Sequence, residues 1–190
     1  MKNLAGDFRV IPTYIYAYQD KYKALPGDDS QAGTRASGAT TATTPSGAVG
    51  NGVINGNWNS TTQTDESYLF WQHVRLSNIA SGSTMVGDAQ QYIPKNTLGG
   101  DIGISGATAA QLQIAGMSGT YQVCSRGILG KFVKQLDVQM DDGQPCTGNL
   151  RAVAEGAALG ATAAKAAGAP ASCTGADLDD ASPYTVCMTF

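Results

Sequence analysis

The chain has 190 residues, enough for one domain with a hydrophobic core, and apolar residues make up 42% of it. Only 14% of the residues are charged, compared with roughly 25% in ordinary soluble domains, and the formal net charge is −3. This composition argues against nucleic acid and against an anionic membrane surface as partners. No apolar stretch reaches the ~20 residues that a membrane span needs, and a surface poor in charge but rich in Gly, Ser and Thr is typical of a secreted protein.

An apolar stripe predicts a helix at the start of the chain. Large apolar residues recur at alternating spacings of four and three, which places them on one helical face: Leu4, Phe8, Ile11, Ile15, Tyr18, Tyr22 and Leu25. Pro12 is expected to bend the helix because it removes a backbone hydrogen bond, and Pro26-Gly27 ends it. Neither a capping residue nor an acidic first turn precedes the stripe, so we expect Met1 to be an artificial start within a longer helix.

A polar segment follows this helix. Residues 32–63 are almost all Ala, Gly, Thr, Ser and Asn, which predicts a long surface loop pinned by Trp58. Asn59-Ser60-Thr61 fits the N-glycosylation pattern, a frequent chance match. Residues 65–80 are predicted to form a second helix, in which His73 is a partly buried structural residue.

After Pro94 the sequence changes to short segments separated by turn residues. We predict strands over 101–105, 111–115, 120–125, 149–154 and 184–190, and either a short helix or a loop over 157–171. A helix is predicted over 128–140, with Phe132, Val133, Leu136 and Met140 pointing inward. The order of helix, loop, helix and then mostly antiparallel strands predicts an α+β fold with the long helix laid on a sheet.

The cysteines are expected to form two disulfides: Cys124, Cys146, Cys173 and Cys187. None has the C-x-x-C spacing of a zinc site, and the one histidine lies far away in the sequence. Of the possible pairings we prefer Cys124–Cys146 and Cys173–Cys187, because each joins neighbours in the sequence. Disulfides place the protein in the periplasm or outside the cell.

No catalytic motif is present in the sequence. It contains neither a G-x-S-x-G elbow nor an H-E-x-x-H motif, so we predict that the protein is not an enzyme and has no cofactor. Carboxylate clusters supply the oxygen ligands that calcium prefers, but none has EF-hand spacing, and turns and helix ends explain them: Asp28-Asp29, Asp137/Asp141/Asp142 and Asp177/Asp179/Asp180. We therefore predict no metal site.

Three stretches resemble the type IV pilins and the type II secretion pseudopilins. The most specific is residues 16–29, which is similar to the end of the family's long N-terminal helix where it enters a Leu-Pro-Gly-Asp turn, here Leu25 to Asp28. Residues 70–75 resemble the family's second helix. Residues 137–143, with Thr147-Gly148 after them, are also similar to such chains.

The resemblance implies a pilin-like fold, in which a long N-terminal helix packs on an antiparallel sheet. The parts of this single domain would be a helix remnant (1–25), an αβ-loop (26–64), the second helix (65–80), a sheet region with a short helix (101–154) and a disulfide-bounded C-terminal region (155–190). In this family Cys173–Cys187 would bound the C-terminal region, whereas a Cys124–Cys146 pair is not a general feature.

The resemblance also implies a structural function. Family members are held in the inner membrane by an N-terminal hydrophobic segment, which is not among the residues of this sequence, and then assemble with copies of the same or related subunits. We therefore expect an extracellular pilus subunit, drawn from a periplasm-facing inner-membrane pool, that serves adhesion, surface motility or secretion. The stripe residues would serve helix packing and assembly. The alternatives are a pseudopilin or minor tip subunit of a type II secretion system, and a secreted adhesin that binds glycans through its polar loop.

Overall fold

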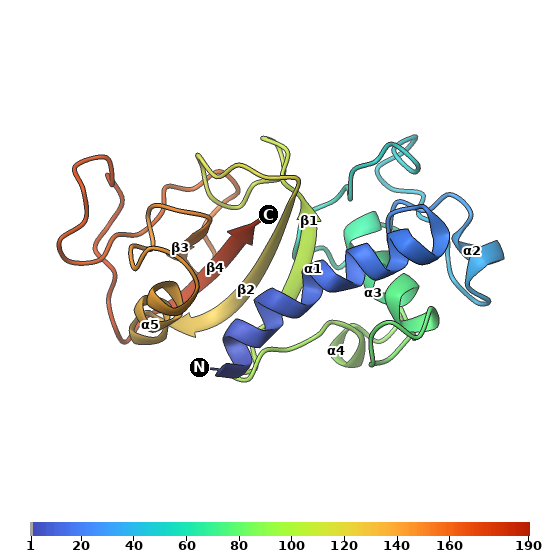
Figure 1. Ribbon diagram of the computed structural model, residues 1–190, viewed down its shortest axis with the longest axis horizontal. Helices are drawn as coiled ribbons and strands as arrows, with labels where there is room; N and C mark the ends of the chain where they lie inside the picture. Colours follow the sequence, from blue (N-terminus) through green and yellow to red (C-terminus); the bar gives the residue numbers. More distant parts are fainter. Residues whose placement is uncertain (1) are drawn as a thin grey trace. The chain divides into compact units, whose positions relative to one another are not determined.

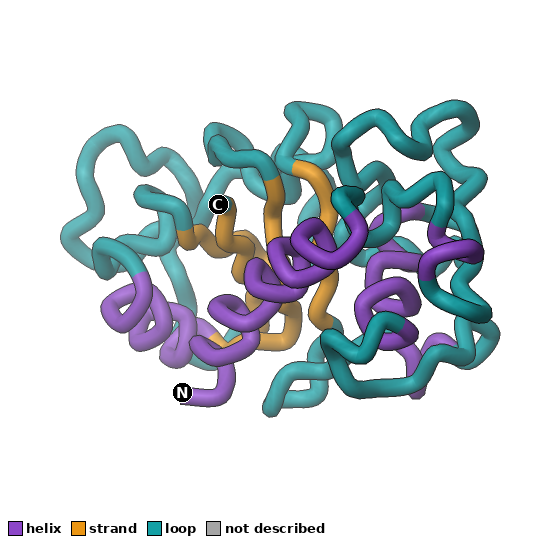
Figure 2. Tube along the Cα trace, turned by 45° about the vertical axis from the view of Figure 1, so that its right-hand side comes forward, coloured by secondary structure: helices purple, strands orange, loops and turns teal. Residues whose placement is uncertain are grey.

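The computed structural model describes residues 2–190, which form two compact units. The sheet unit consists of residues 2–8, Lys95–Ile102 and Ala107–Phe190. The helical unit consists of Arg9–Pro94 and Gly103–Gly106. Loops make up much of both units (Figure 2). The predicted α+β class with an N-terminal helix and an antiparallel sheet is confirmed.

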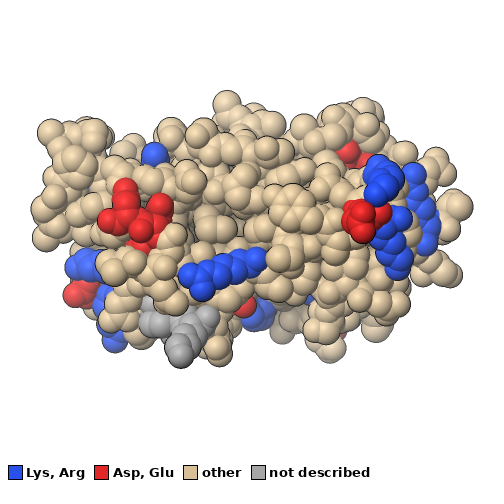
Figure 3. Space-filling view, in the orientation of Figure 1, with Lys and Arg blue, Asp and Glu red and all other residues tan. Residues whose placement is uncertain are grey.

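The elements follow one another in the order shown in Figure 1. The helices are α1 (Lys2–Tyr22), α2 (Ala32–Arg35), α3 (Glu66–Leu76), α4 (Ala89–Tyr92) and α5 (Gly130–Met140). The strands are β1 (Ile102–Gly106), β2 (Tyr121–Leu129), β3 (Leu150–Ala154) and β4 (Pro183–Thr189). Charged side chains are sparse on the face drawn in Figure 3 and occur in small separate groups, as the composition predicts.

The sheet has the strand order β1-β2-β4-β3, and β4 pairs antiparallel with both β2 and β3. The register of β2 on β4 shifts between Ser125 and Ile128, which is the signature of a β-bulge. Within the bulge, Arg126 turns its backbone N–H toward the carbonyl of Asp101, at 3.0 Å, and its guanidinium pairs with the carboxylate of the same residue. The bulge therefore serves to place a charged side chain beside the residues that precede β1.

Helix α1 runs through Pro12 and ends three residues before the predicted Leu25. Lys23 follows it with a φ of 55°, and its N–H donates to the carbonyl of Gln19 at 2.8 Å. A residue in the left-handed conformation directly after a helix closes the last turn. The apolar stripe alone did not predict this stop, because the stripe continues past it to Leu25.

Helices α3 and α5 lie where the sequence predicts them, but only α5 has one buried and one exposed face. Almost every residue of α3 is buried, and the helix ends at Leu76, before the predicted residue 80, because Asn78 adopts a φ of 57°. On α5 the buried apolar residues are Val133 and Leu136, and the helix contacts β2, β3 and β4. Phe132 and Met140, also predicted to point inward, are only half-buried.

The structure corrects the prediction for residues 111–115 and settles the two alternatives left open for residues 157–171. The predicted strand over 111–115 is wrong: only Ile114 forms a bridge, to Ala161, and the segment is otherwise a turn. Its backbone finds other partners, since the N–H of Gln113 donates to the side chain of Gln122 at 3.0 Å and the carbonyl of Leu112 accepts from the N–H of Gly160. The segment 157–171 is a loop rather than a helix.

Candidate functional site

Helix α1 has one buried and one exposed face. Leu4, Phe8, Ile11, Ile15 and Tyr18 of the stripe are buried on α1, as is Leu25 just beyond it, and Tyr22 is half-buried. On the opposite face the large apolar side chains of Val10 and Tyr16 are 38% and 60% exposed. The stripe residues therefore pack inside the chain itself, while the other face offers apolar surface to solvent.

His73 of α3 holds the turn that follows α1. The imidazole is fully buried, and its Nδ1 accepts the backbone N–H of Gly27 at 2.9 Å. Since Nδ1 is the acceptor, Nε2 carries the proton and donates to the carbonyl of Thr40 at 2.8 Å. Burial is the main cause that lowers the pKa of His73, against the smaller opposing effects of Thr40 and Asp29. The neutral ring thus joins the turn after α1 to the long loop.

Asp28 anchors the long loop at a second point. Its buried carboxylate accepts the backbone N–H groups of Gly50, Asn51 at 3.1 Å and Gly52 at 2.7 Å. A carboxylate that accepts several amides is well compensated for its burial. This contact explains the Asp of the Leu-Pro-Gly-Asp turn as an anchor for loop residues far along the chain.

Asp29 ties the same turn to α1 and α2. One oxygen accepts the hydroxyl of Tyr18 at 2.9 Å, and the other accepts Arg35 at 2.7 Å and the N–H of Gln31 at 2.8 Å. The ring of Tyr18 also stacks near that of His73, with centroids 6.1 Å apart. Burial, followed by the bond to Asp29, raises the pKa of Tyr18. The turn, α1, α2 and α3 therefore meet in one polar network, which we call the turn network: Tyr18, Gly27, Asp28, Asp29, Arg35 and His73.

Arg75 is a buried cation that sequence analysis missed. Its Nη1 donates to the carbonyls of Ser83 and Tyr92, both at 2.7 Å, and its guanidinium lies over the rings of Trp71 and Tyr92. Nε has no hydrogen-bond partner among residues 2–190, and burial lowers the pKa of the guanidinium. Aromatic faces and carbonyl dipoles compensate the charge here. The aromatic residues near Arg75 in the sequence could have indicated a cation–π site. Nothing in the sequence, however, indicated that Tyr92 lies near Arg75.

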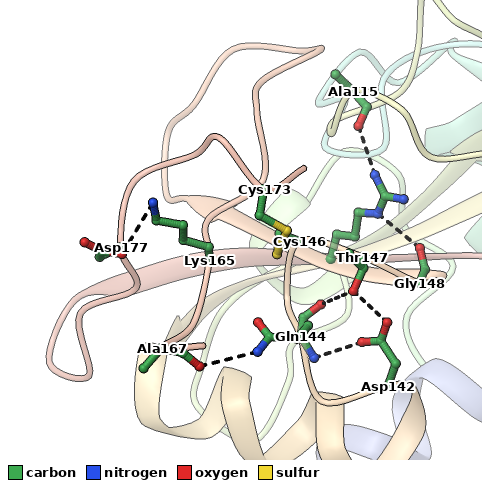
Figure 4. Close-up of a disulfide and its surroundings, with 11 residues drawn as sticks. Ala115, Asp142, Gln144, Cys146, Thr147, Gly148, Lys165, Ala167, Cys173 and Asp177 are labelled. Atoms are coloured by element: carbon green, nitrogen blue, oxygen red, sulfur yellow. Dashed lines mark hydrogen bonds and ion pairs between the residues drawn. A yellow bond between two sulfur atoms is a disulfide. The ribbon is translucent and has the colours of Figure 1, made fainter. Parts of the chain in front are cut away.

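All four cysteines form disulfides, but the preferred pairing is wrong. The bonds are Cys124–Cys187 and Cys146–Cys173. Cys124 and Cys187 lie opposite each other on β2 and β4, with Cα atoms 4.1 Å apart. Strand register, not distance along the chain, decides the partners. The Cys146–Cys173 bond joins the segment before β3, which contains Cys146, to the loop after β3, which contains Cys173 (Figure 4).

The acidic cluster at the end of α5 accepts hydrogen bonds from backbone N–H groups. Asp137 accepts the N–H of Gly143 at 2.6 Å, Asp141 that of Leu150 at 2.7 Å, and Asp142 that of Gln144 at 2.8 Å. Desolvation raises the pKa of Asp137 to about 7, with nearby Asp142 and Asp141 adding to the effect. Within residues 2–190 no group of three His, Cys, Asp or Glu side chains is arranged to hold a metal ion.

Comparison with known proteins found no relative of this chain. No family model, curated protein or solved structure matches the chain. Among the helices of the described residues, none combines the length and hydropathy required to cross a bilayer.

Proposed function

We propose that the chain is the head of a type IV pilin-like subunit that assembles with copies of itself, or with related subunits, into an extracellular filament. The observation that carries the proposal is helix α1, which buries one face, exposes another and leads into the Leu-Pro-Gly-Asp turn. The filament would serve adhesion, surface motility or secretion. Before assembly the subunit would be held in the inner membrane with its head domain in the periplasm.

Because most stripe residues of α1 are buried within the chain, only the exposed face of this helix can contact another subunit. Val10, Thr13 and Ala17 lie three or four positions apart and are exposed or half-exposed on this face, with Tyr16 beside them. A side chain as large as Tyr16 exposed on a helix gains free energy when a second copy covers it. A heterologous contact that does not close into a ring produces an open filament.

The covalent chemistry of the sheet unit supports an extracellular location. Two disulfides form and persist in oxidising compartments. Within the family that the sequence resembles, a disulfide in the C-terminal part favours a pilus subunit, whereas a calcium-bound loop there is typical of the major pseudopilin. Cys146–Cys173 and Cys124–Cys187 both reach into this part of the chain.

The test is site-specific photo-crosslinking in cells that carry the complete gene. A benzophenone amino acid replaces Tyr16, and the matched control places it at Met85, which is 72% exposed in the helical unit. We expect sheared surface filaments to contain the chain and irradiation at position 16 to produce a ladder of oligomers, with much weaker products from position 85. Filaments that lack the chain, together with monomeric chain in the medium, would overturn the proposal and favour a secreted binding module.

A further inference from the structure

A small polar cavity lies beside the Cys146–Cys173 disulfide, entirely within the sheet unit. Its volume is about 120 Å³. The side chains that matter in its lining are one arginine, Arg151, and three hydroxyl residues, Thr162, Ser172 and Thr174. None of the described residues that line it is acidic. The cavity therefore presents hydrogen-bond donors and a positive charge without a negative one.

The guanidinium of Arg151 is held in place but not neutralised. Its Nε donates to the carbonyl of Gly148 at 3.1 Å, and its Nη1 lies 3.4 Å from the carbonyl of Ala115 (Figure 4). In the part of the chain that the structure describes, no carboxylate lies within ion-pair distance of Arg151. A fixed guanidinium with remaining N–H donors is suited to bind an oxyanion through two hydrogen bonds.

The hydroxyl groups around the cavity are also available. Thr162, Ser172 and Thr174 are exposed, and within residues 2–190 their side chains make no hydrogen bond to another group of the chain. Ser172 and Thr174 flank Cys173, so the disulfide to Cys146 fixes the backbone that carries both of them. A covalent tether of this kind lowers the entropy cost of ordering a ligand site.

From these observations we propose that this cavity, the Arg151 site, binds an oxyanion group such as a carboxylate or a sulfate. The guanidinium supplies the charge and the hydroxyl groups of Thr162, Ser172 and Thr174 supply further donors. The site does not depend on filament assembly, because every residue in it belongs to one chain. An anionic group bound here would fasten the subunit to a larger acidic molecule.

A second cavity of about 420 Å³ provides room for the rest of such a molecule. It is lined by the loop 165–171 together with Asp177, and it shares Cys173 with the Arg151 site. Lys165 and Asp177 are among the residues that line it, and their charged atoms lie 3.9 Å apart. The neighbouring polar backbone and this charge pair fit a hydroxylated, hydrophilic group better than an apolar one.

The experiment is an NMR titration of the uniformly labelled chain with sodium acetate and, separately, sodium sulfate, against chloride at constant ionic strength. We expect saturable shifts of the amides of Thr162, Cys173 and Thr174, with half-saturation in the millimolar range, as befits a solvent-accessible site. Arg151→Gln lowers the affinity at least about tenfold, since it removes the charge-assisted donors. Lys131→Gln removes a positive charge from an exposed residue of the same unit, outside both cavities, and leaves the titration unchanged.

A second variant keeps the test decisive if Arg151→Gln disturbs the fold. The double change Ser172→Ala and Thr174→Val alters only exposed side chains and is expected to weaken binding severalfold with Arg151 in place. Saturation by acetate but not by sulfate identifies the carboxylate as the ligand group, and the reverse result identifies the sulfate. Shifts that stay linear up to high concentration, or that persist unchanged in both variants, would overturn the proposal whether or not the chain assembles into filaments.

Discussion

The imidazole Nδ1 of His73 accepts the backbone N–H of Gly27, a residue 46 positions earlier in the chain, at 2.9 Å. Through its other nitrogen the same ring reaches the carbonyl of Thr40. One buried side chain of α3 thus satisfies a donor of the turn after α1 and an acceptor of the long loop. Because each buried polar group would cost free energy if left unpaired, His73 specifies how turn, loop and helix meet.

Replacing His73 with Ala is expected to lower the free energy of unfolding by about 3 kcal/mol. The change opens a cavity and removes the ring from the buried N–H of Gly27 and the part-buried carbonyl of Thr40. Urea unfolding followed by far-UV circular dichroism measures the loss. The control is Gln139→Ala on the exposed face of α5, which should change stability by less than about 0.5 kcal/mol. A loss for His73→Ala as small as that of the control would mean that the two hydrogen bonds are not important for stability.

His73 also makes stability depend on pH. Its pKa is lowered in the folded chain, so the unfolded chain binds a proton at higher pH than the folded one does. Its contribution is therefore complete above the unfolded pKa of 6.5 and is lost as the pH falls below it, by up to about 1.4 kcal/mol per pH unit. Unfolding curves for the parent chain and for His73→Gln between pH 5 and pH 8 test this. The difference between the two should shrink toward pH 5, and a constant difference would contradict the assignment.

Local elements were predictable from the sequence because their signals are local. The apolar spacing from Leu4 to Tyr18 predicted α1 and its buried face, and the spacing of Val133 and Leu136 predicted α5. A glycine after Pro26 predicted a turn. These features depend on neighbours within a few residues, where helix periodicity and turn chemistry act.

The contacts that join these elements were not predictable in the same way. Asp28 looked like a turn residue, but nothing local indicates that it would accept the amides of residues 50–52. The disulfide partners followed from the register of β2 on β4, which a single sequence does not contain. The Arg151 site combines residues from β3, the following loop and the segment around Cys173. Because these residues are far apart in the sequence, the sequence alone does not predict that they form one site.

The pairing of the cysteines can be checked directly by peptide mapping without reduction. Trypsin alone leaves Cys173 and Cys187 in one peptide, because no Lys or Arg lies between them, so cleavage before Asp177 is also needed. We expect the peptide with Cys124 to be joined to that with Cys187, and Cys146 to Cys173. A linked Cys173–Cys187 fragment would contradict the structure.

The two disulfides should also differ in their effect on stability. They span 63 and 27 residues, for which the chain-entropy model gives about 4.3 and about 3.6 kcal/mol. Cys124→Ala with Cys187→Ala also opens the buried centre of β2 and β4, so it should lower the melting temperature more than Cys146→Ser with Cys173→Ser. The latter pair should instead increase cleavage of the loop 166–172 by added protease, because the tether of that loop is lost. Equal losses of melting temperature would contradict this assignment.

Asp137 should give the opposite pH dependence to His73. Its carboxyl group is fully buried, one of its oxygens has no hydrogen-bond partner within the described chain, and its pKa is raised from 3.8 to about 7. Its contribution is therefore complete below pH 3.8 and decreases as the pH rises toward 7. Asp137→Asn is expected to stabilise the chain at pH 8 and to change little at pH 4. Asp180→Asn, which removes an exposed carboxylate, should have a small effect at both values, and an equal gain from both variants would show that net charge alone is responsible.

The turn after α1 offers a matched test of steric fit. Gly27 has a φ of 91°, and a Cβ atom added to it would collide with the backbone carbonyl of Glu66. Gly38 has a similar φ of 86°, but no described atom beyond its chain neighbours lies within 4 Å of an added Cβ. Ala at either position strains the backbone by about 1 kcal/mol, whereas only Ala at position 27 must also displace the first turn of α3.

We therefore expect Gly38→Ala to lower the free energy of unfolding by about 1 kcal/mol, and Gly27→Ala to lower it by at least about 3 kcal/mol or to prevent folding. Denaturant unfolding measures both losses. Hydrogen exchange at the backbone amide of residue 27, which donates to the His73 ring, is a second measurement in any variant that folds. Because the two glycines share the same backbone strain, the difference between them reports the close approach of the turn to α3. Equal losses at the two positions would mean that α3 yields easily and that the turn network does not hold it in place.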